Sequence, residues 1–278
     1  IKKLEEYLGV IIFDRSKQHV IPTDVGRLII DQARDILRES AQLENIAKGY
    51  HQNISGRLNI AIIPTLAPFL LPLFIGKMIE LHPGIKLNIR ELTTAEIIHQ
   101  LKIDEVDVGI LSTPLHEEQI YEDPMFYEEI KIYTQFGHPF SKKKMVSPEE
   151  ISRRSDVWML TNGNCFRNQV INLCKNQYSN DVNAAVNYES GSLETLKKLV
   201  ETEGGFTFLP ELAVNELSSR QLNQVVSFEG QVPLREISLC YVRNAAKKDM
   251  IDILKQCIKE VVPIEMLNKS RGGIVEWR

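Results

Sequence analysis

Two cysteines, Cys165 and Cys174, stand nine positions apart in one amphipathic segment. An Asn-Gly pair predicts a turn, Asn164 after it is a favourable N-cap residue, and the apolar residues that follow recur at helical spacing. The sequence therefore predicts a helix over 165–176. The first turn of a helix exposes unpaired N–H groups, and Arg167 adds a nearby cation, so we expect a larger share of Cys165 to be the reactive thiolate.

The spacing of these two cysteines restricts how they can pair. On an intact helix, nine residues span about 13.5 Å along the axis and place the side chains about half a turn apart. A disulfide requires Cα atoms within roughly 7 Å of each other. The cysteines can pair only if the segment refolds, so a disulfide here would be a conformational signal.

Length and composition are those of a soluble globular protein with two or three domains. The chain has 278 residues, of which 43% are apolar and 25% are charged. A net charge of −4 argues against a surface that coats nucleic acid throughout, but it is compatible with a local basic patch. Four cysteines are too few for a disulfide scaffold and no signal-peptide pattern precedes them. We therefore expect a cytoplasmic protein in which a disulfide is transient and regulatory.

One apolar stretch, residues 58–79, has about the length of a membrane span. Three prolines interrupt it, and proline is tolerated in the first turn of a helix but not in a helix interior. We predict a strand over 58–63 and a helix over 70–81, and we expect no membrane contact.

The N-terminal part is predicted to hold a hairpin and a long helix. Residues 1–8 begin with Ile in the middle of an amphipathic pattern, so we expect that the true N-terminus is missing. Short strands at 10–13 and 19–21 flank a basic hairpin tip. Over 25–50, apolar residues recur at alternating spacings of three and four, which is typical of a helix that packs against another helix. We favour a linker and dimerisation helix with a hinge at 51–56; the alternative is a surface helix folded onto its own domain.

From residue 57 onwards, predicted strands and helices alternate, which favours a parallel sheet covered on both faces. We expect two α/β subdomains with a small-ligand cleft between them. Subdomain I covers about 57–128 and 236–267, and subdomain II about 129–235. The predicted strands are 58–63, 85–91, 106–111, 129–134, 157–160, 184–188, 206–209 and 236–242.

Polar side chains follow three of these strands. Thr65 follows the first, Thr94 the second and Arg243 the last. Two hydroxyls and a guanidinium could converge with Cys165 on a small polar molecule. Each also has a simpler explanation, because threonine often caps a helix and arginine often pairs with a surface carboxylate.

The chain resembles the LysR-type transcriptional regulators along almost its whole length. Residues 10–13 with Arg15, then Thr23-Asp-Val-Gly26 and the long helix, resemble the second half of that family's winged helix-turn-helix and its linker helix. Three further motifs resemble more narrowly the peroxide-sensing members: Ile63-Pro-Thr-Leu-Ala-Pro-Phe-Leu-Leu-Pro72, Gly163-Asn-Cys-Phe-Arg-Asn-Gln169 with Cys174, and Ser192-Leu-Glu-Thr-Leu196 through Gly204-Gly-Phe-Thr-Phe-Leu-Pro210.

The resemblance implies a bacterial activator with three parts. These are a partial winged-helix domain (1–23), a linker and dimerisation helix with its hinge (24–56), and a periplasmic-binding-protein-like α/β regulatory domain (57–278). It implies homodimers or homotetramers that bind promoter DNA and contact RNA polymerase. Arg15, Lys17 and Gln18 at the hairpin tip would contact DNA phosphates; the alternative is a solvated turn with ordinary charges.

In the peroxide-sensing members, the cysteine that matches Cys165 is oxidised by hydrogen peroxide and then bridged by the one that matches Cys174. The expected ligand-binding residues are Thr65, Thr94, Asn164, Arg167 and Arg243. The sequence departs from this pattern at Asn164 and Arg90, where histidine is common, and at Asn168, where aspartate is common. We therefore expect the reactivity of its sensor thiol to differ from that of better-known members.

The other cysteines, Cys240 and Cys257, lie in apolar patterns and are predicted to be core residues. We expect no metal and no cofactor, because His116 and His138 lack partner ligands and there is no Cys-x-x-Cys motif or phosphate loop.

Three functions remain open. The first is a redox-switched DNA-binding regulator, and the second is a regulator of the same build that responds to an organic effector. The third, a thiol peroxidase, is disfavoured because an enzyme needs neither the long helix nor the basic hairpin.

Overall fold

The computed structural model describes residues 1–16, 19–49, 54–174, 191–243 and 245–277. The chain divides into two compact units. Unit 1 comprises Ile1–Ile54 with Asn244–Lys248, and unit 2 comprises Ser55–Arg243 with Asp249–Arg278. The division falls within the stretch where the sequence predicts a hinge.

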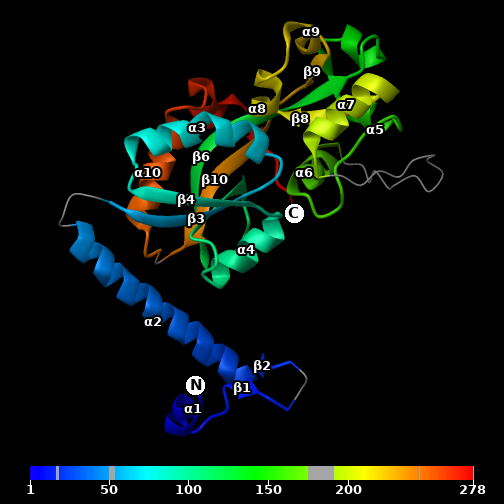
Figure 1. Ribbon diagram of the computed structural model, residues 1–278. Coiled ribbons are helices and arrows are strands. Elements are labelled where there is room, and N and C mark those ends of the chain that lie inside the picture. Colours follow the sequence, from blue (N-terminus) through cyan, green and yellow to red (C-terminus); the bar gives the residue numbers. More distant parts are fainter. Residues whose placement is uncertain (17–18, 50–53, 175–190, 244, 278) are drawn as a thin grey trace. The chain divides into compact units, whose positions relative to one another are not determined.

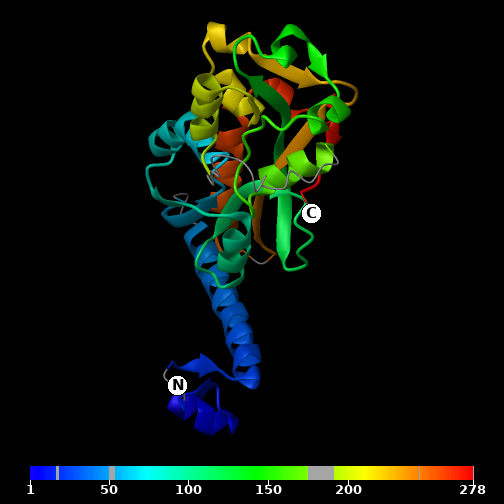
Figure 2. The ribbon, with the colours of Figure 1, turned by 90° about the vertical axis from the view of Figure 1, so that its right-hand side faces the viewer.

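Unit 1 consists of a short helix, a two-stranded hairpin and one long helix (Figures 1 and 2). Thr23 caps the long helix, because its Oγ1 accepts the N–H of Gly26 at 2.9 Å. A Cβ at Gly26 would lie 1.9 Å from the carbonyl oxygen of Ile12, so only glycine fits at this contact. The elements are α1 (Lys2–Leu8), β1 (Phe13–Asp14), β2 (Ile21–Pro22) and α2 (Asp24–Gly49).

Unit 2 is built on a mixed sheet whose strands run in the order β4-β3-β5-β10-β6-β9-β7, with β8 and β11 paired at its side (Figure 1). Strands β3 (Gly56–Ile62), β4 (Ile85–Glu91) and β5 (Val108–Thr113) are parallel, as the sequence predicts, and all of β5 is buried. The remaining strands are β6 (Ile120–Thr134), β7 (Met145–Val146), β8 (Phe206–Pro210), β9 (Val225–Phe228), β10 (Pro233–Val242) and β11 (Gly273–Ile274).

The long strand β6 joins the two halves of the sheet. Its first part pairs with β10, and its last residues pair with β8 and β9. The strand predicted over 129–134 is therefore the end of a longer one. The strand predicted over 157–160 is reduced to a single bridge between Val157 and Phe206, and that predicted over 184–188 lies outside the described residues.

Helices cover both faces of the sheet. The chain moves in opposite directions along the sheet on going from β3 to β4 and from β4 to β5, so right-handed crossovers place α3 and α4 on opposite faces (Figure 1). Among the described residues, no helix is long and apolar enough to cross a membrane. The helices are α3 (Ala67–Leu81), α4 (Thr94–Lys102), α5 (Pro148–Ser152), α6 (Cys165–Cys174), α7 (Leu193–Glu203), α8 (Glu211–Asn215), α9 (Ser219–Leu222) and α10 (Lys248–Lys259). In the described part of the chain, 3₁₀ turns span Pro139–Lys142, Ile264–Leu267 and Lys269–Arg271.

Candidate functional site

Helix α6 begins at one cysteine and ends at the other. Cys165 and Cys174 are both buried, and neither forms a disulfide. Asn164 caps the helix, because its Oδ1 accepts the N–H of Phe166 at 2.9 Å. The predicted helix start and cap are confirmed, and the helix is continuous between the cysteines. At about 1.5 Å of rise per residue, they lie too far apart along its axis to pair in this state.

The first turn of α6 packs against a buried arginine from β10. The guanidinium carbon of Arg235 lies 5.1 Å from the centroid of the Phe166 ring, and Phe166 is the neighbour of Cys165 in sequence. Both terminal nitrogens of Arg235 donate to Oγ1 of Thr65 at 3.4 Å. Thr65 lies between β3 and α3, at the carboxyl edge of the parallel strands. Thr65, Arg235 and the start of α6 therefore form one buried cluster.

Glu128 of β6 balances the charge of this arginine. Its Oε1 lies 2.8 Å from Nε of Arg235, and both side chains are fully buried. Burial raises the pKa of Glu128, while the nearby Arg235 cation and the N–H of Leu212 oppose that rise. Removal of one partner from a buried pair typically costs about 3–5 kcal/mol, so the pair fixes the place of Arg235.

Arg243 does not join this cluster, contrary to the sequence-based expectation. Strand β10 runs antiparallel to β5, with Glu236 opposite Thr113 and Cys240 opposite Gly109. The start of β10 therefore lies at the carboxyl edge of β3 and β5, and Arg243, which follows its end, lies at the opposite edge. Arg235 was not predicted, because the predicted strand began at residue 236; the signal for it was the adjacent charged pair Arg235-Glu236 at the start of a largely apolar run.

Thr94 lies at the same carboxyl edge as Thr65. It is the first residue of α4, and Thr93 rather than Thr94 caps that helix, in a capping box with Glu96. Within the described part of the chain, the buried Oγ1 of Thr94 has no hydrogen-bond partner. This hydroxyl is available to a ligand, but no contact joins it to Arg235.

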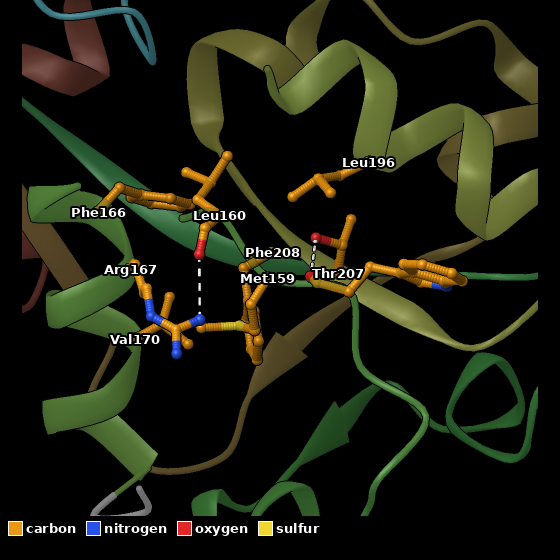
Figure 3. A pocket seen from close by; sticks show the side chains of 9 residues that line it. Met159, Leu160, Phe166, Arg167, Val170, Leu196, Thr207 and Phe208 are labelled. Atoms are coloured by element: carbon orange, nitrogen blue, oxygen red, sulfur yellow. Dashed lines mark hydrogen bonds between the residues drawn. The ribbon is translucent and has the colours of Figure 1, made fainter. Parts of the chain in front are cut away.

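Arg167 lines a small cavity between α6 and the neighbouring α7 and β8. Figure 3 shows its side chain extending from α6 towards the carbonyl oxygen of Leu160, to which it donates at 3.0 Å. Leu196 and Phe208 line the other side of the cavity. Burial lowers the pKa of this guanidinium, because removal from water disfavours its charged form.

The middle of α6 contacts residues near the end of the chain. The sequence did not predict this contact. Nε2 of Gln169 donates to the carbonyl oxygen of Val275 at 2.8 Å and to Oγ of Ser112 at 3.1 Å. Nδ2 of Asn172 donates to the carbonyl oxygen of Glu276 at 2.9 Å. In Figures 1 and 2 the last residues of the chain run beside α6. Two donors from the middle of α6 therefore hold the C-terminal segment.

Cys240 and Cys257 are buried in β10 and α10, as predicted. Burial raises the pKa of both thiols, which favours the unreactive protonated form. Among the described residues, no three side chains of the types that bind metals come together.

In unit 1, the hairpin is tied to α1. Arg15 donates through both terminal nitrogens to Oε2 of Glu5, each at 3.0 Å, and Oε1 of Glu5 accepts the N–H groups of Ile12 and Phe13. Arg15 thus serves to fix the hairpin, and its side chain remains partly exposed. Lys17 and Gln18 lie outside the described residues.

Comparison with known proteins identifies the family. Residues 51–263 match the model of the LysR substrate binding domain. The chain belongs to the LysR-type transcriptional regulators. The mixed α/β sheet of unit 2 is the regulatory fold that the sequence predicts for this family, and the family is one of regulators rather than a class of enzymes.

Within the LysR-type regulators, the chain is similar to the OxyR proteins. It is 31% identical over 262 residues to the hydrogen peroxide-inducible genes activator of Haemophilus influenzae, covering 94% of this chain and 86% of that protein. It is 30% identical over 259 residues to the DNA-binding transcriptional dual regulator OxyR of Escherichia coli K12, covering 93% and 84%. A full-length OxyR variant from Pseudomonas aeruginosa matches with a TM-score of 0.78 at 27% identity, covering 94% and 87%.

Proposed function

We propose that this LysR-type regulator activates transcription in response to hydrogen peroxide through a reversible Cys165–Cys174 disulfide. The observation that carries the proposal is α6, in which one buried thiol begins the helix, Phe166 of its first turn packs against the Thr65-bonded Arg235, and a second thiol ends it. The peroxide-activator names of its relatives support the same function.

The first step is oxidation of Cys165. Its thiolate attacks one oxygen of the peroxide, an S–O bond forms, the O–O bond breaks, and the leaving hydroxide takes a proton to become water. Arginine can only donate hydrogen bonds, so Thr65 accepts from Arg235 and its own O–H proton can point to the peroxide. Thr65 and Arg235 stabilise the leaving hydroxide, and the buried Thr94 hydroxyl supplies a second donor.

The second step forms the disulfide. The thiolate of Cys174 attacks the sulfur of the Cys165 sulfenic acid, the S–S bond forms, the S–O bond breaks, and hydroxide leaves as water. Because α6 separates the sulfurs, it must unwind before this step. One feature already weighs against the helix, because burial of the Arg167 guanidinium in α6 disfavours its charged form.

The refolded segment then alters how the regulatory units pack, and so changes the presentation of DNA-binding units to promoter DNA and RNA polymerase. Helix α2 is the proposed dimerisation element. Ile36, which belongs to the apolar repeat of this helix, is 63% exposed in the single chain, as residues of an unoccupied helix seam would be. Homodimers, or homotetramers built from them, would cover this seam.

The alternative of an organic effector at the same edge finds less support. Cys165, Thr65 and Arg235 are at most 3% exposed, so a molecule as small as hydrogen peroxide suits these buried groups better than a larger organic effector.

Mass mapping without reductant tests the proposal. After treatment with hydrogen peroxide, we expect a linked Cys165–Cys174 peptide in the wild type, a sulfenic acid at Cys165 in Cys174→Ser, and neither in Cys165→Ser. Promoter-dependent transcription should rise only in the wild type. A Cys165→Ser variant that still responds to peroxide would show that the cysteines are incidental.

A further inference from the structure

We infer that Gln169 and Asn172 clip the C-terminal segment, residues 273–277, onto the reduced form of α6, and that these contacts set the rate of the disulfide-forming step. Disulfide formation then releases the segment. The inference rests on the proposed function and extends it to residues outside the peroxide-reactive cluster.

The segment is held along its whole length. Its first two residues form β11, which pairs with Pro233 and Leu234 of β10. The N–H of Val275 donates to the carbonyl oxygen of Leu234 at 2.8 Å. At its end, the indole N–H of Trp277 donates to the carbonyl oxygen of Pro114 at 2.9 Å. Between these anchors, the segment is bonded to α6 by its carbonyl oxygens.

Both clip residues lie between the two cysteines. Gln169 and Asn172 are four and seven positions after Cys165, hence three apart and on one face of the helix. The helix cannot unwind between Cys165 and Cys174 while their amides keep the distances of 2.8 Å and 2.9 Å to Val275 and Glu276. Refolding therefore breaks the contacts at the middle of the segment.

Coupling of this kind acts in both directions. If unwinding loosens the segment, then the attached segment opposes unwinding and delays the attack of Cys174 on the oxidised Cys165. The first step should not change, because peroxide reacts with Cys165 while α6 is still folded. The clip residues are therefore positioning residues for the second step alone.

The matched pair Asn172→Ala and Asn168→Ala tests this separation. Both changes place a better helix former in α6, which by itself slows unwinding, but only the first removes a contact with the segment. We expect Asn172→Ala to speed disulfide formation about threefold, and Gln169→Ala/Asn172→Ala about tenfold. Asn168→Ala should equal the wild type or be slower. Sulfenic acid formation, followed with dimedone in a Cys174→Ser background, should be unchanged in all three.

Hydrogen exchange followed by mass spectrometry tests release directly in the full chain. The Val275 amide should exchange slowly in the reduced protein and faster once the disulfide has been verified in the same sample. Unchanged exchange in a sample that contains the disulfide, or Asn172→Ala no faster than Asn168→Ala, would overturn the inference and leave the proposed function standing. Absence of the disulfide from the wild type would instead remove the proposed function. Asn172 is exposed, so Asn172→Ala should fold normally. This variant keeps the inference testable even if the change at the buried Gln169 prevents folding.

Discussion

At the scale of single residues, Arg235 determines what Thr65 can do. A guanidinium offers only N–H groups, so the hydroxyl oxygen is committed as an acceptor and its proton is left for another partner. Glu128 holds the arginine in this role at 2.8 Å. The buried ion pair thus sets the direction of one hydroxyl proton.

Replacing Thr65 with valine removes that proton and retains most of the side-chain volume. We expect the second-order rate of Cys165 oxidation by hydrogen peroxide to fall about a hundredfold, the usual effect of losing one preorganised donor to a developing oxyanion. Alkylation of Cys165 by iodoacetamide needs no such donor and should not change. Thr65→Ser should restore most of the oxidation rate. An equal loss in both reactions would mean that the variant has disturbed the packing of α6.

Glu5 gives a second prediction at this scale, because it joins α1 to the hairpin. The N–H of Phe13, then that of Ile12 and the guanidinium of Arg15, lower the pKa of its carboxyl below the usual value. A lowered pKa means that the stabilisation is present above the pKa of the unfolded carboxyl and is lost as the pH falls through that of the folded one. In NMR spectra, the amide protons of Ile12 and Phe13 should shift together with an acidic midpoint below that of an ordinary glutamate. Glu5→Gln should abolish the shift; a midpoint at or above the ordinary value would contradict the assignment.

At the scale of elements, α6 shows which parts of the site the sequence could predict. Its start, its cap and its two cysteines depend on local signals: a turn, an Asn side chain that accepts a nearby N–H, and helical periodicity. The arginine of the site could not be predicted from such local signals. Choosing between Arg235 and Arg243 required the direction of β10, which depends on its pairing with β5 and β6, far away in sequence.

The contacts of Gln169 were beyond sequence reasoning for the same reason. Its amide bonds to Ser112 and Val275, which are 57 and 106 positions away. Thr65 and Thr94 were easier, because parallel strands end at one edge of a sheet and the strand–helix alternation predicted parallel strands. Features that depend on nearby residues could be predicted from the sequence. Contacts with antiparallel strands and with the end of the chain could not.

At the scale of the whole molecule, the division into two units separates the residues of the proposed peroxide chemistry from those proposed to bind DNA. Cys165, Cys174, Thr65, Arg235 and the C-terminal segment all belong to unit 2. A fragment of residues 55–278 should therefore form the disulfide with peroxide at a rate within about twofold of the full chain, as measured by mass mapping. If α2 is the dimerisation helix, the same fragment should sediment as a smaller species. A fragment that folds, as judged by circular dichroism, but is inert to peroxide would show that the site needs unit 1.

The position of Trp277 in the C-terminal segment allows tryptophan fluorescence to report the unwinding of α6. The chain has two tryptophans. The indole of Trp277 bonds to Pro114 beside the clipped segment, and that of Trp158 bonds to Gly204 and lines the cavity behind α6. Unwinding of α6 would bring both indoles closer to water, and indole emission moves to longer wavelength as its surroundings become more polar. Formation and reduction of the proposed Cys165–Cys174 disulfide could then be followed continuously by intrinsic fluorescence, without any label.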